Sequence, residues 1–204
     1  MPDMMPDYGW QAVTVVSNFG TLTGEGRNLK RYRRSVNAHR WQLEFTTPPL
    51  NDEQTREFFG FLQGLKGSLN SFYYIHPRYS KPNGRIASSN TAKLNKKADA
   101  GAKLINIATT LPLSEDYYKI GDPIQFVGDS RVYTVISVSK TDASGVGDIG
   151  ISPPLSRDLT ATTPIRTEDI KFLLMLEDDE IAMEMEGGDG FYTEYTVSAI
   201  EDLL

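Results

Sequence analysis

Alternating hydrophobic and polar positions predict two strands near the start of the chain. Residues 10–16 form a short β-prone run. Residues 39–46 carry an apolar side chain at every second position, namely Trp41, Leu43 and Phe45. A period of two is typical of a half-buried strand, because successive side chains point to opposite faces of a sheet. We therefore expect both segments to cover a core with one face.

The segment between these two strands has the length of a strand but is charged on both faces. Within residues 28–36, Arg31 and Arg33 share one face, while Lys30 and Arg34 share the other. Charged side chains on both faces give such a strand no obvious place in a core.

A helix is predicted after the two prolines that follow the second strand. Asn51 can cap its first turn, and Gln54, three residues later, completes a capping box. An apolar face at helical spacing follows, formed by Phe58, Phe59, Phe61, Leu62 and Leu65. Lys66 and Gly67 supply a stop signal at the carboxyl end. We expect this helix to pack on a sheet.

Beyond the helix, an aromatic, β-prone run at residues 71–76 ends at Pro77. The composition then changes, because residues 80–103 are rich in Gly, Ser, Asn and Lys and contain no aromatic residue. We interpret this stretch as a linker or an exposed loop.

A second series of short β-prone runs is separated by Gly-Asp turns and a Gly-rich loop. The runs lie at residues 103–108, 123–127, 131–139 and 148–152. Short strands at this spacing indicate a small barrel or sandwich. After a Pro- and Thr-rich loop at residues 153–164, the apolar run at residues 169–176 predicts a buried strand. Alternation on both sides of a Gly-rich turn in residues 181–197 predicts a hairpin.

The strongest apolar strands flank the middle of the chain on both sides, which predicts an interrupted domain. We expect a mainly β protein with a discontinuous, sandwich- or barrel-like outer domain that carries one packed helix. Residues 1–82 with 166–204 form this domain, and residues 83–165 form an inserted small β-barrel domain.

Composition narrows the functional classes. The 204 residues include no cysteine, which excludes disulfides, thiolate zinc sites and cysteine nucleophiles. A net charge of −6 argues against general binding to phosphate backbones. The first ten residues lack the features of a signal peptide, and no apolar run reaches the roughly 18 residues of a membrane span. We therefore expect synthesis in a cytoplasm and no insertion into a membrane.

The charges are unevenly distributed along the chain. Residues 27–40 include six basic residues and no acidic one, while residues 177–204 include ten acidic residues and no Lys or Arg. Each run can be a solvated face, but the two could also meet between neighbouring copies of the chain. The candidate subunit-interface residues are Lys30, Arg31, Arg33, Arg34, Glu184, Glu186 and Glu194.

Motifs with catalytic or cofactor-binding chemistry are absent from the sequence, including the dinucleotide, P-loop, nucleophile-elbow and zincin patterns. His39 and His76 have no further His or Cys close in sequence, so we expect a metal at neither. The acidic run at residues 177–180 could offer oxygen ligands to calcium, but it is more simply a solvated turn. We expect no catalytic residue, no cofactor and no metal.

Two segments carry a resemblance to a known family. In residues 40–77, a strand, a Phe- and Leu-rich helix that ends in a Leu-x-Gly turn, and an aromatic strand follow one another. Residues 119–155 contain a Gly-Asp-x-Ile-Gln-Phe strand, a Val-Tyr-x-Val strand, a Gly-rich loop and a strand that ends in Pro-Pro-Leu. In this order of elements the chain resembles the distal tail proteins of long-tailed, siphovirus-type bacteriophages and related tail-tip ring proteins.

That resemblance implies a structural virion component rather than an enzyme. Such proteins form a ring, usually hexameric, that joins the tail tube protein to the proteins of the tail-tip hub or baseplate and lets phage DNA pass without specific binding. The alternative function is a carbohydrate-binding module of the tail tip that contacts the host surface, with Tyr73, Tyr74 and Tyr79 as a stacking platform. A small glycosidase or peptidase has no specific support.

Overall fold

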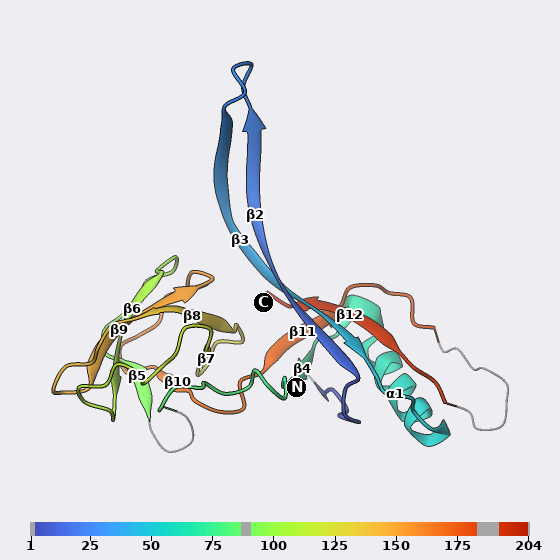
Figure 1. Ribbon diagram of the computed structural model, residues 1–204. Helices are drawn as coiled ribbons and strands as arrows, with labels where there is room; N and C mark the ends of the chain where they lie inside the picture. Colours follow the sequence, from blue (N-terminus) through green and yellow to red (C-terminus); the bar gives the residue numbers. More distant parts are fainter. Residues whose placement is uncertain (1–2, 87–90, 183–191, 204) are drawn as a thin grey trace. The chain divides into compact units, whose positions relative to one another are not determined.

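The computed structural model describes residues 3–86, 91–182 and 192–203 (Figure 1). The protein is mainly β, and its internal contacts divide it into two compact units. The outer unit comprises Met1–Tyr74 and Leu173–Leu204, and the inserted unit comprises Ile75–Phe172. The expected limits of the insertion, residues 83 and 165, therefore lie inside the inserted unit.

The outer unit contains one six-stranded sheet, in the order β1, β4, β11, β12, β3, β2. The bounds of these strands are β1 Asp3–Met4, β2 Ala12–Glu25, β3 Arg31–Thr46, β4 Phe72–Tyr74, β11 Phe172–Leu176 and β12 Thr196–Glu201. β12 lies between β11 and β3 and is antiparallel to both. The predicted alternation in β3 is confirmed, because Leu43 and Phe45 are fully buried and Trp41 nearly so.

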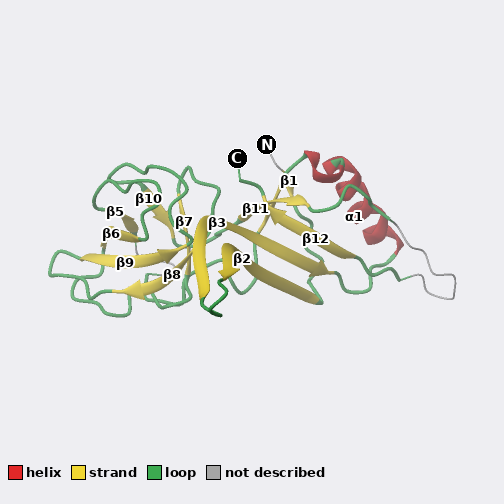
Figure 2. Ribbon diagram, turned by 90° about the horizontal axis from the view of Figure 1, so that it is seen from above, coloured by secondary structure: helices red, strands yellow, loops and turns green. Residues whose placement is uncertain are grey.

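The helix α1, Asp52–Leu65, is the element that the sequence predicts most closely. The Asn51 Oδ1 accepts a hydrogen bond of 3.0 Å from the Gln54 N–H, and the Gln54 Oε1 accepts one of 3.1 Å from the Asn51 N–H. Lys66 caps the carboxyl end of the helix with a left-handed backbone conformation. A short 3-10 helix, η1 Gly67–Leu69, follows. α1 runs beside β12 in both views (Figure 1 and Figure 2), and the Phe58 ring contacts the ring of Tyr195.

β2 and β3 are much longer than the two predicted strands. They pair with each other from Ala12↔Thr46 to Glu25↔Arg31, whereas β12 covers β3 only from Thr46 to Gln42. Beyond that point β2 and β3 continue as a two-stranded ribbon that projects from the sheet of the outer unit (Figure 1). We call residues 19–39 the arm.

The inserted unit is a closed six-stranded barrel in the order β10, β5, β6, β9, β8, β7. Its strands are β5 Ala92–Leu94, β6 Leu104–Thr109, β7 Pro123–Phe126, β8 Tyr133–Val138, β9 Val146–Ser152 and β10 Pro164–Arg166. β6 to β9 correspond to the four predicted runs. The mainly β class with a small inserted barrel is therefore confirmed.

The interpretation of residues 80–103 as a linker or exposed loop is wrong in part. Ile86 and Leu94 from this stretch are fully buried in the barrel core. β5 pairs with both β6 and β10, so it closes the barrel. A three-residue strand flanked by lysines and asparagines is too short to show a hydrophobic period, which explains why the pattern concealed it.

The predicted hairpin at residues 181–197 falls mostly on residues 183–191, which lie outside the described part of the chain. The strand that follows, β12, pairs with β11 and β3. The predicted buried strand at residues 169–176 is confirmed as β11, in which Leu174 is fully buried.

Candidate interaction site

The arm brings four of the predicted interface residues to one place. Lys30, Arg31, Arg33 and Arg34 all lie at or near its tip, and all four are exposed. Within the hairpin, the Arg31 Nε lies 3.5 Å from a carboxylate oxygen of Glu25, the residue directly opposite it. The acidic candidates are elsewhere: Glu194 is exposed shortly before β12, and Glu184 and Glu186 lie outside the described residues.

Pairing with β2 gives the arm two unlike faces, a feature that sequence reasoning missed. Residues directly opposite each other in an antiparallel pair lie on the same face. Leu22 is opposite Arg34 and Gly24 is opposite Tyr32, whereas Thr23 is opposite Arg33. One face is therefore polar, and the other carries apolar side chains.

The apolar face of the arm is open to solvent. The exposed fractions are 62% for Leu22, 63% for Tyr32 and 52% for Val36. At Gly20 an added Cβ would lie 3.4 Å from the Val36 Cβ and 3.5 Å from the Ala38 Cβ, which is ordinary van der Waals contact. The face combines an apolar stripe with the charge of Arg34.

The tip of the arm presents one further apolar side chain. The Leu29 N–H donates a hydrogen bond of 2.9 Å to the Gly26 carbonyl, and the Gly26 N–H donates one of 2.9 Å to the Lys30 carbonyl. Leu29 has a φ of 60° and is 80% exposed, the highest value among the large apolar side chains of the described chain. Most of the Leu29 side chain is therefore in contact with solvent.

At the base of the arm, His39 is a packing residue. Its side chain is buried, its Nε2 lies 2.9 Å from the Ser17 Oγ, and its ring contacts those of Phe19 and Trp41. His76, in the inserted unit, accepts a hydrogen bond of 3.0 Å at Nδ1 from the Arg78 N–H. Burial, the largest effect, lowers the pKa of His76 below its ordinary value.

The acidic segment after β11 is held against η1. The Asp179 Oδ1 accepts hydrogen bonds from the Ser68 N–H at 2.9 Å and from the Ser68 hydroxyl at 2.7 Å. These bonds lower the pKa of the Asp179 carboxyl below its ordinary value. Gly67 allows the close approach, because a Cβ there would lie 2.5 Å from the Asp179 Oδ1. Its neighbours Asp178 and Glu180 remain exposed.

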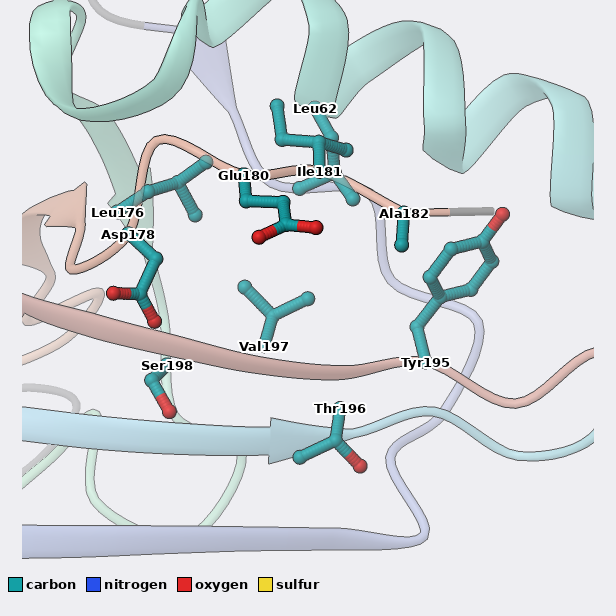
Figure 3. Close-up of a pocket in the computed structure, with 10 residues that line it drawn as sticks. All are labelled: Leu62, Leu176, Asp178, Glu180, Ile181, Ala182, Tyr195, Thr196, Val197 and Ser198. Carbon is teal, nitrogen blue, oxygen red and sulfur yellow. The ribbon is translucent and has the colours of Figure 1, made fainter. Parts of the chain in front are cut away.

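A pocket of about 140 Å³ lies between α1, the acidic segment and β12 (Figure 3). Its apolar lining consists of Leu62, Leu176, Ile181, Ala182 and Val197. The carboxylates of Asp178 and Glu180 also line it, and Figure 3 shows the Glu180 carboxylate pointing toward Val197. A wider hollow next to it is lined by Asp178, Glu180 and Glu194, among others. The pocket thus combines apolar side chains with two carboxylates and several hydroxyl groups.

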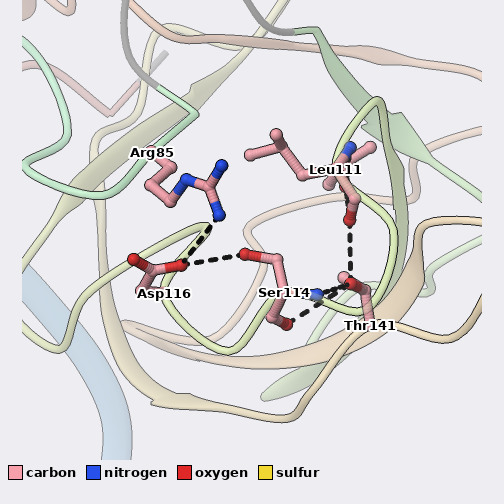
Figure 4. Close-up of polar contacts among 6 residues, drawn as sticks. Arg85, Leu111, Ser114, Asp116 and Thr141 are labelled. Atoms are coloured by element: carbon pink, nitrogen blue, oxygen red, sulfur yellow. Dashed lines mark hydrogen bonds and ion pairs between the residues drawn. The ribbon is translucent and has the colours of Figure 1, made fainter.

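The buried polar groups of the barrel have structural roles. The Asp122 carboxylate accepts hydrogen bonds from the backbone N–H groups of Asn83, Gly84 and Lys119, at 2.7 to 3.1 Å. In the network of Figure 4, the Thr141 hydroxyl accepts a hydrogen bond of 2.7 Å from the Ser114 N–H and donates one of 2.8 Å to the Leu111 carbonyl. These contacts fasten loops to the barrel.

The three tyrosines of the carbohydrate hypothesis do not form an exposed platform. Tyr74 is buried, with its ring centroid 4.6 Å from that of Phe45, and Tyr73 alternates with it on β4. Tyr79 belongs to the inserted unit, where its hydroxyl lies 2.7 Å from the Thr134 Oγ1 and its ring stacks on Phe172. Nothing in this arrangement favours sugar stacking.

The residues that the structure describes contain no group of three or more His, Asp or Glu side chains placed to hold a metal ion. Within the same residues, the one α-helix falls short of the length and hydrophobicity needed to cross a membrane. Comparison of the sequence with models of protein families gives no match, and comparison with curated proteins gives none either.

Proposed function

We propose that this protein is a structural subunit that assembles with copies of itself through the arm. The observation that carries the proposal is the exposure of the arm on both faces. A two-stranded ribbon is only marginally stable in water, and it needs further packing to be rigid. Exposed apolar side chains that gather in one patch are typical of interaction sites, and the arm gathers Leu22, Leu29, Tyr32 and Val36.

Among structural subunits, we propose a distal tail protein of a long-tailed bacteriophage. The order of elements that resembles this family supports it: strand, helix with a Leu-x-Gly turn and aromatic strand are β3, α1 and β4. The second resembling segment supplies strands of the barrel. In this proposal the chain forms a hexameric ring in the virion, between the tail tube protein and the tail-tip hub.

The net charge of −6 agrees with a channel that lets DNA pass without binding it. No enzymatic step and no cofactor is part of this role, which needs a rigid scaffold and surfaces between subunits.

Electron microscopy and sedimentation of the purified protein test the proposal. At concentrations high enough for assembly, we expect closed rings of six copies in the micrographs and a sedimentation coefficient that corresponds to a hexamer. Electron microscopy of virions should show the same ring at the end of the tail tube. A protein that is monomeric at every concentration and is missing from the virion would contradict the proposal.

A further inference from the structure

The strongest unused features of the outer unit are the basic arm tip and the pocket that Asp178 and Glu180 help to line. Building on the proposed self-assembly, we propose that the arm tip of one copy docks in the pocket between α1 and β12 of a second copy. Leu29 enters the pocket, and the basic residues beside it meet the carboxylates of Asp178 and Glu180.

The pocket has the volume to admit a leucine side chain next to Leu62, Leu176 and Val197. An apolar cavity of about 150 Å³ can hold a group the size of benzene, and this pocket has about 140 Å³. Leu29 is 80% exposed, so transfer into the pocket removes apolar surface from water. The hydrogen bond from Leu29 to Gly26 closes a turn with Arg27 and Asn28 at its centre, so Leu29 directly follows the end of the hairpin.

Charge complementarity selects this partner surface. Lys30, Arg31, Arg33 and Arg34 surround the tip. Asp178, Glu180 and Glu194 line the pocket and its adjoining hollow, and the sequence has no Lys or Arg after Lys171 to neutralise them. The hydrogen bonds from Ser68 to Asp179 fix the acidic segment in place, so its carboxylates are already positioned for a cationic partner.

The contact has to form between two copies. The pocket residue Ser198 pairs with Glu44 of β3, whereas Leu29 lies at the opposite end of that strand. At about 3.3 Å per residue, the fifteen residues from Glu44 to Leu29 span roughly 50 Å along a strand. A contact between two different patches on neighbouring copies is head-to-tail, and repetition of it closes a ring when the rotation allows.

Cysteine cross-linking tests the docking directly, because the chain has no cysteine of its own. One preparation carries Asn28→Cys beside the tip leucine, and another carries Ala182→Cys at the pocket. A short bismaleimide should join the mixed preparations at least ten times faster than it joins Asn28→Cys chains to Leu113→Cys chains. Leu113 is exposed on the inserted unit and serves as the control.

Charge reversal adds a second readout. Arg31→Glu with Arg33→Glu in the first chain, or Asp178→Lys with Glu180→Lys in the second, should each reduce the cross-linking rate at least tenfold. Combining the two reversed chains should restore it, because the attraction is re-formed with opposite signs.

The outcomes separate this inference from the proposed function. Rings that form while cross-linking at Ala182 is no faster than at Leu113, or that resist both charge reversals, overturn the docking and leave the ring proposal standing. A chain that is monomeric and missing from the virion overturns the ring proposal, and pocket-specific cross-linking in that case would still support a two-copy contact.

Discussion

The side chain of Leu29 has no function in its own chain that the structure shows. It is exposed, and its left-handed backbone conformation disfavours residues other than Gly and Asn. Leu113 is a natural match, since it has a φ of 51° and is also exposed.

We therefore expect Leu29→Asn to leave the melting temperature unchanged or slightly raised, and to weaken ring assembly at least tenfold in sedimentation equilibrium. Leu113→Asn should relieve the same backbone strain without any effect on assembly. Equal effects of the two substitutions would contradict a role for Leu29 in contacts between copies.

Gly67 illustrates a different requirement, close approach of two segments. Its φ is +67°, and a Cβ would lie 2.9 Å from the Asp179 Cα. We expect Gly67→Ala to lower the free energy of unfolding by about 1–3 kcal/mol, because it adds both backbone strain and a collision.

The matched control is Gly60→Ala in α1, where an added Cβ meets no atom within 4 Å. That substitution should raise the free energy of unfolding by about 0.5–1 kcal/mol through helix propensity. Urea denaturation of both variants measures the difference, and a neutral Gly67→Ala would show that the acidic segment is not held as closely as described.

The basic residues of the candidate site could be predicted from the sequence one at a time, but the apolar face of the arm could not. Arg31, Arg33 and their neighbours were predicted as interface residues because charge on both faces of a strand has no place in a core. The apolar stripe was missed because Leu22 and Tyr32 come together only through the register of β2 and β3. Register is a property of two segments, and a pattern within one segment does not contain it.

At the scale of elements, the helix was predictable because its signals are local. The capping box, the apolar face and the stop at Lys66 all lie within about sixteen residues. The structure refines the apolar face: Phe58 is fully buried, while Phe59 and Phe61 are half-buried.

Phe58→Ala should therefore lower the free energy of unfolding by about 3–5 kcal/mol, as expected for loss of a buried aromatic ring. Phe58 contacts the rings of Tyr8, Trp10 and Tyr195, and an alanine would leave a cavity among them. Phe59→Ala, one position along the helix, should cost clearly less. Thermal melting followed by circular dichroism compares the two, and equal losses would show that the buried side of α1 has been misassigned.

The strands were predicted unevenly, for reasons that depend on length and neighbours. β6 to β9 show enough alternation and turn chemistry to be found, whereas β5 and β10 have only three residues each. Strands as short as these are specified by the barrel that they close and not by their own sequence.

At the scale of the whole molecule, the insertion is bounded by neighbouring strands. The chain leaves the outer unit after β4 and returns in β11, and these two strands are adjacent in the sheet. Inside the inserted unit, the Ile170 N–H donates a hydrogen bond of 2.9 Å to the Ser80 carbonyl, so the entering and leaving segments run together. Closing such a gap with a short linker costs little loop entropy.

A Gly/Ser linker can replace Ile75–Phe172, and we expect the shortened chain to remain folded. Its circular dichroism spectrum should show the helical signal of α1, and its thermal melting should be cooperative. Residues 75–172 alone should also melt cooperatively, because the barrel has its own core. The contrasting deletion replaces only residues 83–165. It removes Thr134 and Gln125, the hydrogen-bond partners of Tyr79 and Lys171, and leaves Tyr79 and Lys171 in the chain. We expect this shortened protein to aggregate. A non-cooperative outer unit would mean that the two units share one folding transition.

The irregularity at the base of the arm has a geometrical consequence for any ring built by docking. Between the pairs Phe19↔His39 and Thr21↔Ser35, one residue of β2 faces three residues of β3. A bulge of this kind bends a ribbon and increases its twist. In a docked ring, the bend sets the angle that each copy makes with the next, and that angle determines how many copies complete the circle. In such a ring, the number of subunits depends on two additional backbone residues at the base of the arm, away from the tip that docks.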